Sequence, residues 1–119
     1  MILPIQNPSG KSSSPQGKPL FVVGQVIEHK RYGYRGVIVD FDTSCNASEQ
    51  WYQKNQTKPN RHQPWYHVLV HDTHITTYAA QTSLTATNDL TAITHPLIAM
   101  FFDGFDDGLY LRNDVPWPN

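Results

Sequence analysis

A short basic segment, HKRYGYRG at residues 29–36, carries the side chains best suited to anion binding in this sequence. It combines one histidine, one lysine and two arginines with two tyrosines and two glycines. Lysine and arginine side chains and exposed backbone amides are the groups that contact phosphates, and a glycine turn lets the backbone approach closely. A solvated hairpin end is the alternative interpretation. The candidate anion-binding residues are His29, Lys30, Arg31, Tyr34 and Arg35.

A second candidate site lies in the segment RHQPWYHVLV, residues 61–70. The amide of Gln63 can bind a base edge or a peptide group, and the indole of Trp65 can stack on a base or hold an apolar side chain. Because side chains alternate along a strand, the predicted core face consists of Tyr66, Val68 and Val70. The opposite face consists of Trp65, His67 and Leu69. Trp65 then either marks an interface or lies under the loop at residues 52–62.

The spacing of the candidate ligands and nucleophiles favours neither metal binding nor catalysis. His67 and His71 would share a strand face, but four residues of extended chain place them roughly 13 Å apart, too far to bind one ion. Cys45 is the single cysteine, so no intramolecular disulfide can form, and no activating motif surrounds it. We therefore predict no catalytic residues, no metal site and no cofactor, and we expect that the protein is not an enzyme.

The composition is that of one near-neutral globular domain. The 119 residues suffice for one hydrophobic core, and the formal net charge of -1 argues against strong, non-specific binding of nucleic acid. The charges are nevertheless unevenly distributed. Up to Lys58 there are seven Lys and Arg against four Asp and Glu, and beyond it two against six. A local basic patch is therefore compatible with an acidic whole.

Residues 1–19 are predicted to form a flexible tail, and residues 20–119 to form a single β-barrel domain. The stretch 7–19 contains no hydrophobic residue, so burial cannot offset the entropy lost on ordering it. The opening MILPIQNPSG lacks the basic region and long apolar stretch of a secretion signal, and no run approaches the ~20 apolar residues of a membrane helix. We expect a cytoplasmic protein without membrane contact.

Two segments rich in β-branched and aromatic residues, 21–29 and 34–42, are predicted to form a β-hairpin around the candidate anion site. If the loop is the dipeptide Tyr32-Gly33, the register places Val26 opposite Val39. The same register places Lys30 directly opposite Arg35. Like charges opposed across two strands repel each other, and an anion between them would relieve that repulsion.

The remaining segments complete a mainly β protein. Asn46 with Glu49 three positions later is a possible capping box, which predicts a short helix that carries Trp51. Further strands are predicted at 65–71, 75–81 and 109–118, and a short helix is predicted within 97–105. Several short strands with turns and one or two short helices indicate a small, partly open β-barrel.

Five sequence blocks, taken in order, resemble those of a known family. They are HKRYGYRGVIVDFD, SCNASEQW, QPWYHVLV, TYAAQTSL and HPLIAMFFDGF. With these blocks the chain resembles, from Leu20 to its C-terminus, the YccV-like, or HspQ-type, hemimethylated-DNA-binding domain, in the form found in F-box proteins and plastid Clp adaptors. The resemblance implies an SH3-like barrel without catalytic residues. The chain departs from the family pattern at Thr82 and Ser83, where an acidic residue and Asn are usual.

The resemblance implies two functions, and both stay open. The first is a non-catalytic module that binds DNA, with a hemimethylated duplex as the implied ligand and the basic hairpin tip as the phosphate contact. The second is a protein adaptor or specificity factor that brings client proteins to an ATP-dependent protease of the Lon or Clp type. In that case the tail would serve as a tether. The apolar contacts would then come from Trp65, Trp117, Phe101, Phe102 and Phe105.

Overall fold

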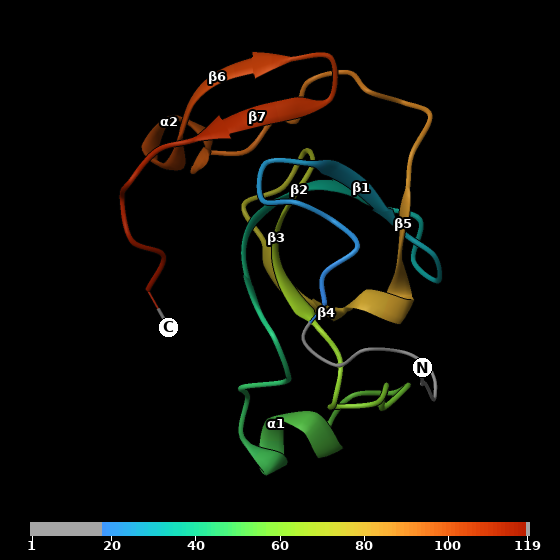
Figure 1. The fold of residues 1–119 in the computed structure, drawn as a ribbon. Coiled ribbons are helices and arrows are strands. Elements are labelled where there is room, and N and C mark those ends of the chain that lie inside the picture. The colour runs from blue at the N-terminus through green and yellow to red at the C-terminus, as the bar shows by residue number, and fades with distance from the viewer. Residues whose placement is uncertain (1–17, 119) are drawn as a thin grey trace, which may run out of the picture.

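The computed structural model describes residues 18–118, so the predicted tail lies outside the described residues except for its last two positions. Five antiparallel strands form one curved sheet in the order β4-β3-β2-β1-β5, and two more form a separate hairpin. The sheet strands are β1 (Val26–His29), β2 (Arg35–Asp42), β3 (Trp65–Val70), β4 (Thr76–Ala80) and β5 (Leu84–Ala86). The sheet does not close, and the predicted mainly β, partly open barrel is confirmed (Figure 1).

The remaining elements lie around this sheet. They are α1 (Glu49–Gln53), the 3-10 helix η2 (Gln81–Ser83), α2 (Ile98–Phe101), β6 (Phe102–Asp106) and β7 (Leu109–Arg112). The β6–β7 hairpin covers one side of the sheet, and α1 lies at the far end of β2 and β3 (Figure 1). No helix within residues 18–118 is both long and apolar enough to cross a membrane.

The register of the β1–β2 hairpin differs from the predicted one by two residues. Val26 pairs with Val37 and Glu28 with Arg35, so Lys30 does not lie opposite Arg35. The loop contains four residues, 30–33, because the His29 N–H donates to the Tyr34 carbonyl at 2.9 Å. A favoured two-residue turn requires positive φ at its first central residue, whereas only Gly33 in this loop has one, at +74°. The shift is even, so Val26, Val37 and Val39 share one face, but a bulge in β2 between Ile38 and Asp40 places Phe41 on the opposite face, against Tyr66.

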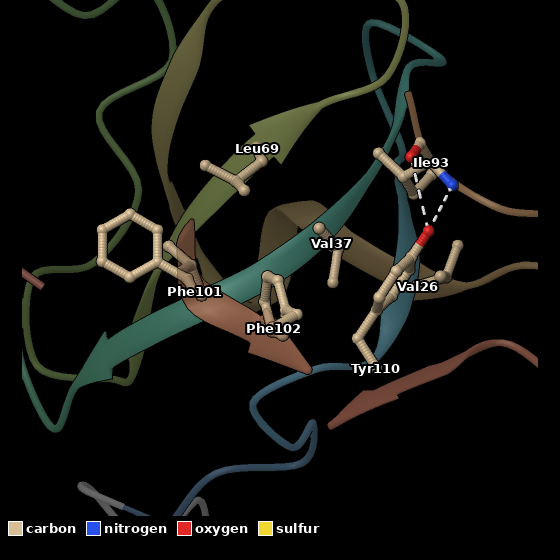
Figure 2. Packing of buried hydrophobic residues seen from close by; sticks show 8 residues of the cluster. Val26, Val37, Leu69, Ile93, Phe101, Phe102 and Tyr110 are labelled. Carbon is tan, nitrogen blue, oxygen red and sulfur yellow. Dashed lines mark hydrogen bonds between the residues drawn. The ribbon is translucent and has the colours of Figure 1, made fainter. Parts of the chain in front are cut away.

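Both faces of the sheet are buried, which corrects the prediction of a single core face. The adjacent residues Val37 and Ile38 are both 0% exposed, and they belong to different hydrophobic clusters. The first cluster lies under β6, β7 and α2 (Figure 2). Its residues are Val26, Val37, Val39, Leu69, Ile93, Phe101, Phe102 and Tyr110. The second lies inside the curve of the sheet and consists of Ile27, Ile38, Tyr66, Val68, Ala79 and Leu84.

A buried tyrosine joins the chain segment before α2 to the β6–β7 hairpin. The Tyr110 hydroxyl accepts a hydrogen bond from the Ile93 N–H at 2.8 Å and donates to the Ile93 carbonyl at 3.3 Å (Figure 2). Phe101 and Phe102 belong to the same cluster and are 3% and 6% exposed. These two side chains are therefore core residues, which corrects their predicted role as apolar partner contacts.

The helix that carries Trp51 begins later than the predicted capping box. Its N-cap is Ser48, whose Oγ accepts from the Trp51 N–H at 3.1 Å. Asn46 instead donates its backbone N–H to the Tyr78 hydroxyl at 2.9 Å, so it connects this segment to β4. The C-terminal helix is also shorter than predicted, because α2 ends at Phe101 and the chain continues directly into β6.

Candidate nucleic-acid interface

His29 organises the hairpin tip from within. It is only 8% exposed, and its Nδ1 accepts hydrogen bonds from the N–H groups of Arg31 and Tyr32, both at 3.1 Å. The ring also stacks on Tyr32, with centroids 4.7 Å apart, and lies 5.0 Å from the ring of Tyr34. Burial and then the nearby Arg31 charge lower the pKa of His29, which favours the neutral ring that can accept. His29 is therefore a structural acceptor rather than a cation facing solvent.

Lys30 and Arg31 are the exposed cations of the tip. Within residues 18–118 neither of them forms an ion pair. The Arg31 guanidinium lies 5.8 Å from the centre of the Tyr32 ring, and Tyr32 itself is 59% exposed. The space beside Gly33 is open, since a Cβ there would meet no atom within 4 Å. Two cations, one aromatic ring and an accessible backbone therefore project together, as phosphate binding requires.

Arg35 does not contribute its charge to the tip. Its Nε lies 3.3 Å from a carboxylate oxygen of Asp89, and its Nη1 donates to the carbonyls of Asp89 and Thr91 at 3.1 and 2.9 Å. The side chain is only 12% exposed, and it ties the chain after β5 to the sheet. Tyr34 is half-buried, and its hydroxyl hydrogen-bonds the Thr77 hydroxyl at 2.8 Å. Of the five predicted residues, Lys30 and Arg31 are therefore the two whose charges are exposed at the tip.

Gln63 and Trp65 lie in the interior. The Gln63 side chain donates to the Asn60 carbonyl at 2.7 Å and accepts from the Thr82 N–H at 3.0 Å. Trp65 is 1% exposed, and its ring contacts those of Trp51 and Tyr52, with centroids 6.0 and 6.5 Å apart. Of the two alternatives for Trp65, the structure shows the second: α1 and the segment after it cover this face of β3, so Trp65 is not an exposed anchor.

His67 lies in a polar cluster that the sequence did not reveal. Its Nε2 is 3.5 Å from Asp42 Oδ2, and the same oxygen accepts from the Tyr78 hydroxyl at 2.6 Å. The His67 and Tyr78 rings stack with centroids 4.5 Å apart. Burial and the hydrogen bond to Asp42 raise the pKa of Tyr78, so its hydroxyl stays protonated and donates. Within residues 18–118, no three potential metal ligands come together.

A groove of about 490 Å³ lies beside the tip. Its lining includes residues 55–57 and Pro59 after α1, the rings of His29, Tyr32 and Tyr34, and all of β4. A smaller hollow, lined by Lys30 and Arg31, shares His29, Thr57, Pro59 and Ser83 with it. Sequence reasoning missed the groove because its walls come from segments far apart in the chain.

The fold and the exposed tip define a small, partly open β-barrel with a local cationic surface. The chain matches the family model described as "Hemimethylated DNA-binding protein YccV like" over residues 19–109, and it belongs to this YccV-like family. The family predicted from the five sequence blocks is therefore confirmed. F-box only protein 21 of Mus musculus is 34% identical over 96 residues, and the protein of that name from Homo sapiens is 33% identical. Each match covers 78% of this chain and 15% of the relative's length.

Proposed function

We propose that the chain is a non-catalytic DNA-binding module that contacts backbone phosphates through Lys30 and Arg31, with a hemimethylated duplex as its ligand. One observation carries the proposal. In a family described by hemimethylated DNA binding, the hairpin tip presents two exposed cations that no carboxylate within residues 18–118 neutralises. The open backbone at Gly33 supports close approach of a phosphate to this tip.

The strength of this binding is limited by the number of cations. Each neutralised phosphate contributes about -0.9 to the slope of log affinity against log salt concentration, so two contacts give a slope of about -1.8. With a net charge of only -1 and acidic residues in the second half of the chain, no long-range attraction adds to these contacts. We therefore expect weak binding that depends on the local geometry of the tip.

Fluorescence anisotropy with labelled duplexes tests the proposal. Unmodified, hemimethylated and fully methylated forms of one duplex are titrated with the full chain at several salt concentrations. We expect the tightest binding to the hemimethylated form. The double variant Lys30→Ala/Arg31→Ala should lose binding to all three duplexes, because the phosphate contacts themselves are removed.

The matched control is Lys18→Ala/Lys54→Ala, which removes the same number of positive charges from two exposed positions outside the tip. It should bind DNA as the unsubstituted chain does. Equal losses in both double variants would show that net charge, and not the tip, governs binding. Equal affinity for the three duplexes would remove hemimethylation from the proposal, and binding that does not change with salt would overturn the phosphate contacts.

A second candidate is the protein adaptor that serves an ATP-dependent protease of the Lon or Clp type. The observation that favours it is the groove beside the tip, which is lined by β4, the strand at the edge of the sheet. Of the predicted apolar contacts, Phe105 is 40% exposed and Trp117 is half-buried, which leaves both accessible to a partner. Pull-down of purified Lon and Clp proteases with the full chain tests this candidate, and capture of neither would exclude it for those proteases.

A further inference from the structure

Strand β4 is an edge strand. Among residues 18–118 it pairs with β3 alone, on one side, and it ends the strand order of the five-stranded sheet. The Val70 N–H donates to the Ile75 carbonyl, and the Gln81 N–H donates to the Pro64 carbonyl. The odd-numbered residues from 75 to 81 are therefore the ones whose backbone groups bond to β3. In an antiparallel ladder the intervening residues direct their N–H and C=O groups to the other side. These residues are Thr76, Tyr78 and Ala80.

The groove described above surrounds this free edge. All five residues of β4 line it, so the groove follows the length of the strand. Aromatic rings flank the strand: Trp51 and Trp65 pack on Tyr78, and the hydroxyl of Tyr34 hydrogen-bonds Thr77, whose side chain points to the opposite face of β4. An unpaired row of backbone donors and acceptors along a groove matches an extended polypeptide, which can bond as an added strand. A DNA duplex does not offer that alternation of donors and acceptors.

The charge around the groove selects the kind of polypeptide. Among the residues that the structure describes, no Asp or Glu lines the groove or the adjoining hollow, whereas Lys30 and Arg31 line the hollow. Ser83, which follows β4 through η2, belongs to both linings, so the cations lie near the Ala80 end of the edge. A negatively charged residue at that end of a bound segment would meet two cations that have no other ionic partner within residues 18–118.

We propose that the groove binds an extended, acidic peptide segment of another protein, which adds a strand to the free edge of β4. The backbone groups of Thr76, Tyr78 and Ala80 form the new ladder, and Lys30 and Arg31 bind the acidic residues. The proposal deepens the adaptor candidate, because it names the chemical class of the segment that an adaptor of this fold would hold. It does not depend on DNA binding.

A random peptide library displayed on phage, selected on the full chain, supplies the probe. We expect the enriched peptides to carry Asp or Glu near one end. When such a peptide is synthesised and bound, hydrogen exchange should slow at the amides of Thr76, Tyr78 and Ala80, because these N–H groups gain acceptors. Replacing alternate peptide residues with N-methylated ones removes peptide donors while keeping the side chains, and it should abolish binding.

Ala80→Pro is the sharpest change to the protein. The φ of Ala80 is -69°, within the range that the proline ring requires, and the N–H that proline lacks is one that points away from β3. Because Ala80 is only 1% exposed, the added ring carbons must also fit among its neighbours. The matched control is Ala86→Pro, which removes an outward N–H from β5, the opposite edge. We expect Ala80→Pro to weaken peptide binding at least about tenfold, equivalent to one lost hydrogen bond plus blocked approach, and Ala86→Pro to leave it unchanged.

The outcomes separate this inference from the DNA proposal. Ala80→Pro should leave duplex binding intact. Lys30→Ala/Arg31→Ala should weaken the binding of both the duplex and the peptide. Two results would overturn the inference. In the first, the unsubstituted chain selects no peptide that binds it more tightly than it binds Ala80→Pro. In the second, bound peptides leave the amides of Thr76, Tyr78 and Ala80 unprotected. If a duplex protects those amides and no peptide does, the groove belongs to nucleic acid. The amide measurement uses the unsubstituted chain, so it decides the question even if Ala80→Pro does not fold.

Discussion

The imidazole of His29 holds the hairpin tip together through a single nitrogen. Nδ1 accepts the N–H groups of Arg31 and Tyr32, and it can do so only while it carries no proton. Protonation would turn this acceptor into a donor facing two other donors, next to the Arg31 guanidinium. The two exposed cations of the tip are therefore positioned by a side chain whose own positive charge would disrupt them.

We predict that the stability of the protein falls as the pH decreases through the His29 titration. The folded-state pKa of His29 lies below its ordinary value of 6.5, because of burial first and Arg31 second. Between these two pKa values the unfolded chain binds more protons, so the free energy of unfolding rises with pH there and is fully restored above 6.5. Urea unfolding at a series of pH values measures this, and His29→Gln should flatten the dependence.

The control for this prediction is His74→Gln, which changes an exposed histidine in the turn before β4. That variant should keep the pH dependence of the unsubstituted chain. If His29→Gln also keeps it, another group is responsible. DNA binding by the tip should weaken over the same range as the turn loosens, although the total positive charge increases, which separates the positioning effect from a simple charge effect.

Gly24 joins the sheet to the β6–β7 hairpin. Its N–H donates to the Ile38 carbonyl and its carbonyl accepts from the Tyr110 N–H, both at 2.7 Å. Its φ is +96°, and a Cβ at this position would overlap the Tyr110 carbonyl oxygen. Both the backbone conformation and the close approach of the two layers therefore require glycine here.

A pair of glycine substitutions separates these two requirements. Gly24→Ala should destabilise the fold by about 3 kcal/mol or more, since backbone strain and overlap with Tyr110 add to each other. Gly33→Ala, at φ +74° with open space around it, should cost only about 1 kcal/mol, the strain alone. Chemical denaturation of both variants measures the difference. Equal losses would show that the approach of β7 to Gly24 contributes nothing to stability.

The same elements show what the sequence predicted and where its signals failed. Runs of β-branched and aromatic residues located β2, β3 and β4 to within one or two residues, because the local preference of these runs for extended structure is strong. The register of β1 and β2 depended on the turn at His29, whose side-chain hydrogen bonds have no sequence signature. The sequence did not predict β6, because Phe101 and Phe102 belong to one continuous apolar run although the backbone changes from helix to strand between them.

The candidate site was predictable only in part, for a related reason. A basic segment is visible in the sequence, but the partners that neutralise or bury its members are far away in the chain. Asp89 lies 54 residues after Arg35 and binds its guanidinium. Strand alternation assigned Trp65 to the outer face correctly, yet α1 covers that face, and no local pattern predicts where a five-residue helix packs.

For the molecule as a whole, the two hydrophobic clusters are separated only by the sheet they share. β2 contributes Val37 to one cluster and Ile38 to the other, and β3 contributes Leu69 and Val68 in the same way. The β6–β7 hairpin and α2 pack on the first cluster, while the curved interior of the sheet closes over the second. Neither cluster can keep its shape if the strands between them separate.

We therefore predict that the two layers unfold in one cooperative transition. Leu69→Ala in the first cluster and Ile38→Ala in the second should each cost about 2 to 5 kcal/mol, and each should shift the same single transition. Tryptophan fluorescence reports on Trp51 and Trp65 near α1 and on Trp117 beside Phe101, and circular dichroism reports on the strands. The two signals should coincide in both variants.

If the β6–β7 hairpin formed an independent layer, Leu69→Ala would split the melting curve, and an earlier step would appear in only one signal. Coincident curves would mean that the hairpin tip and the β4 groove lose their geometry only when the entire barrel unfolds.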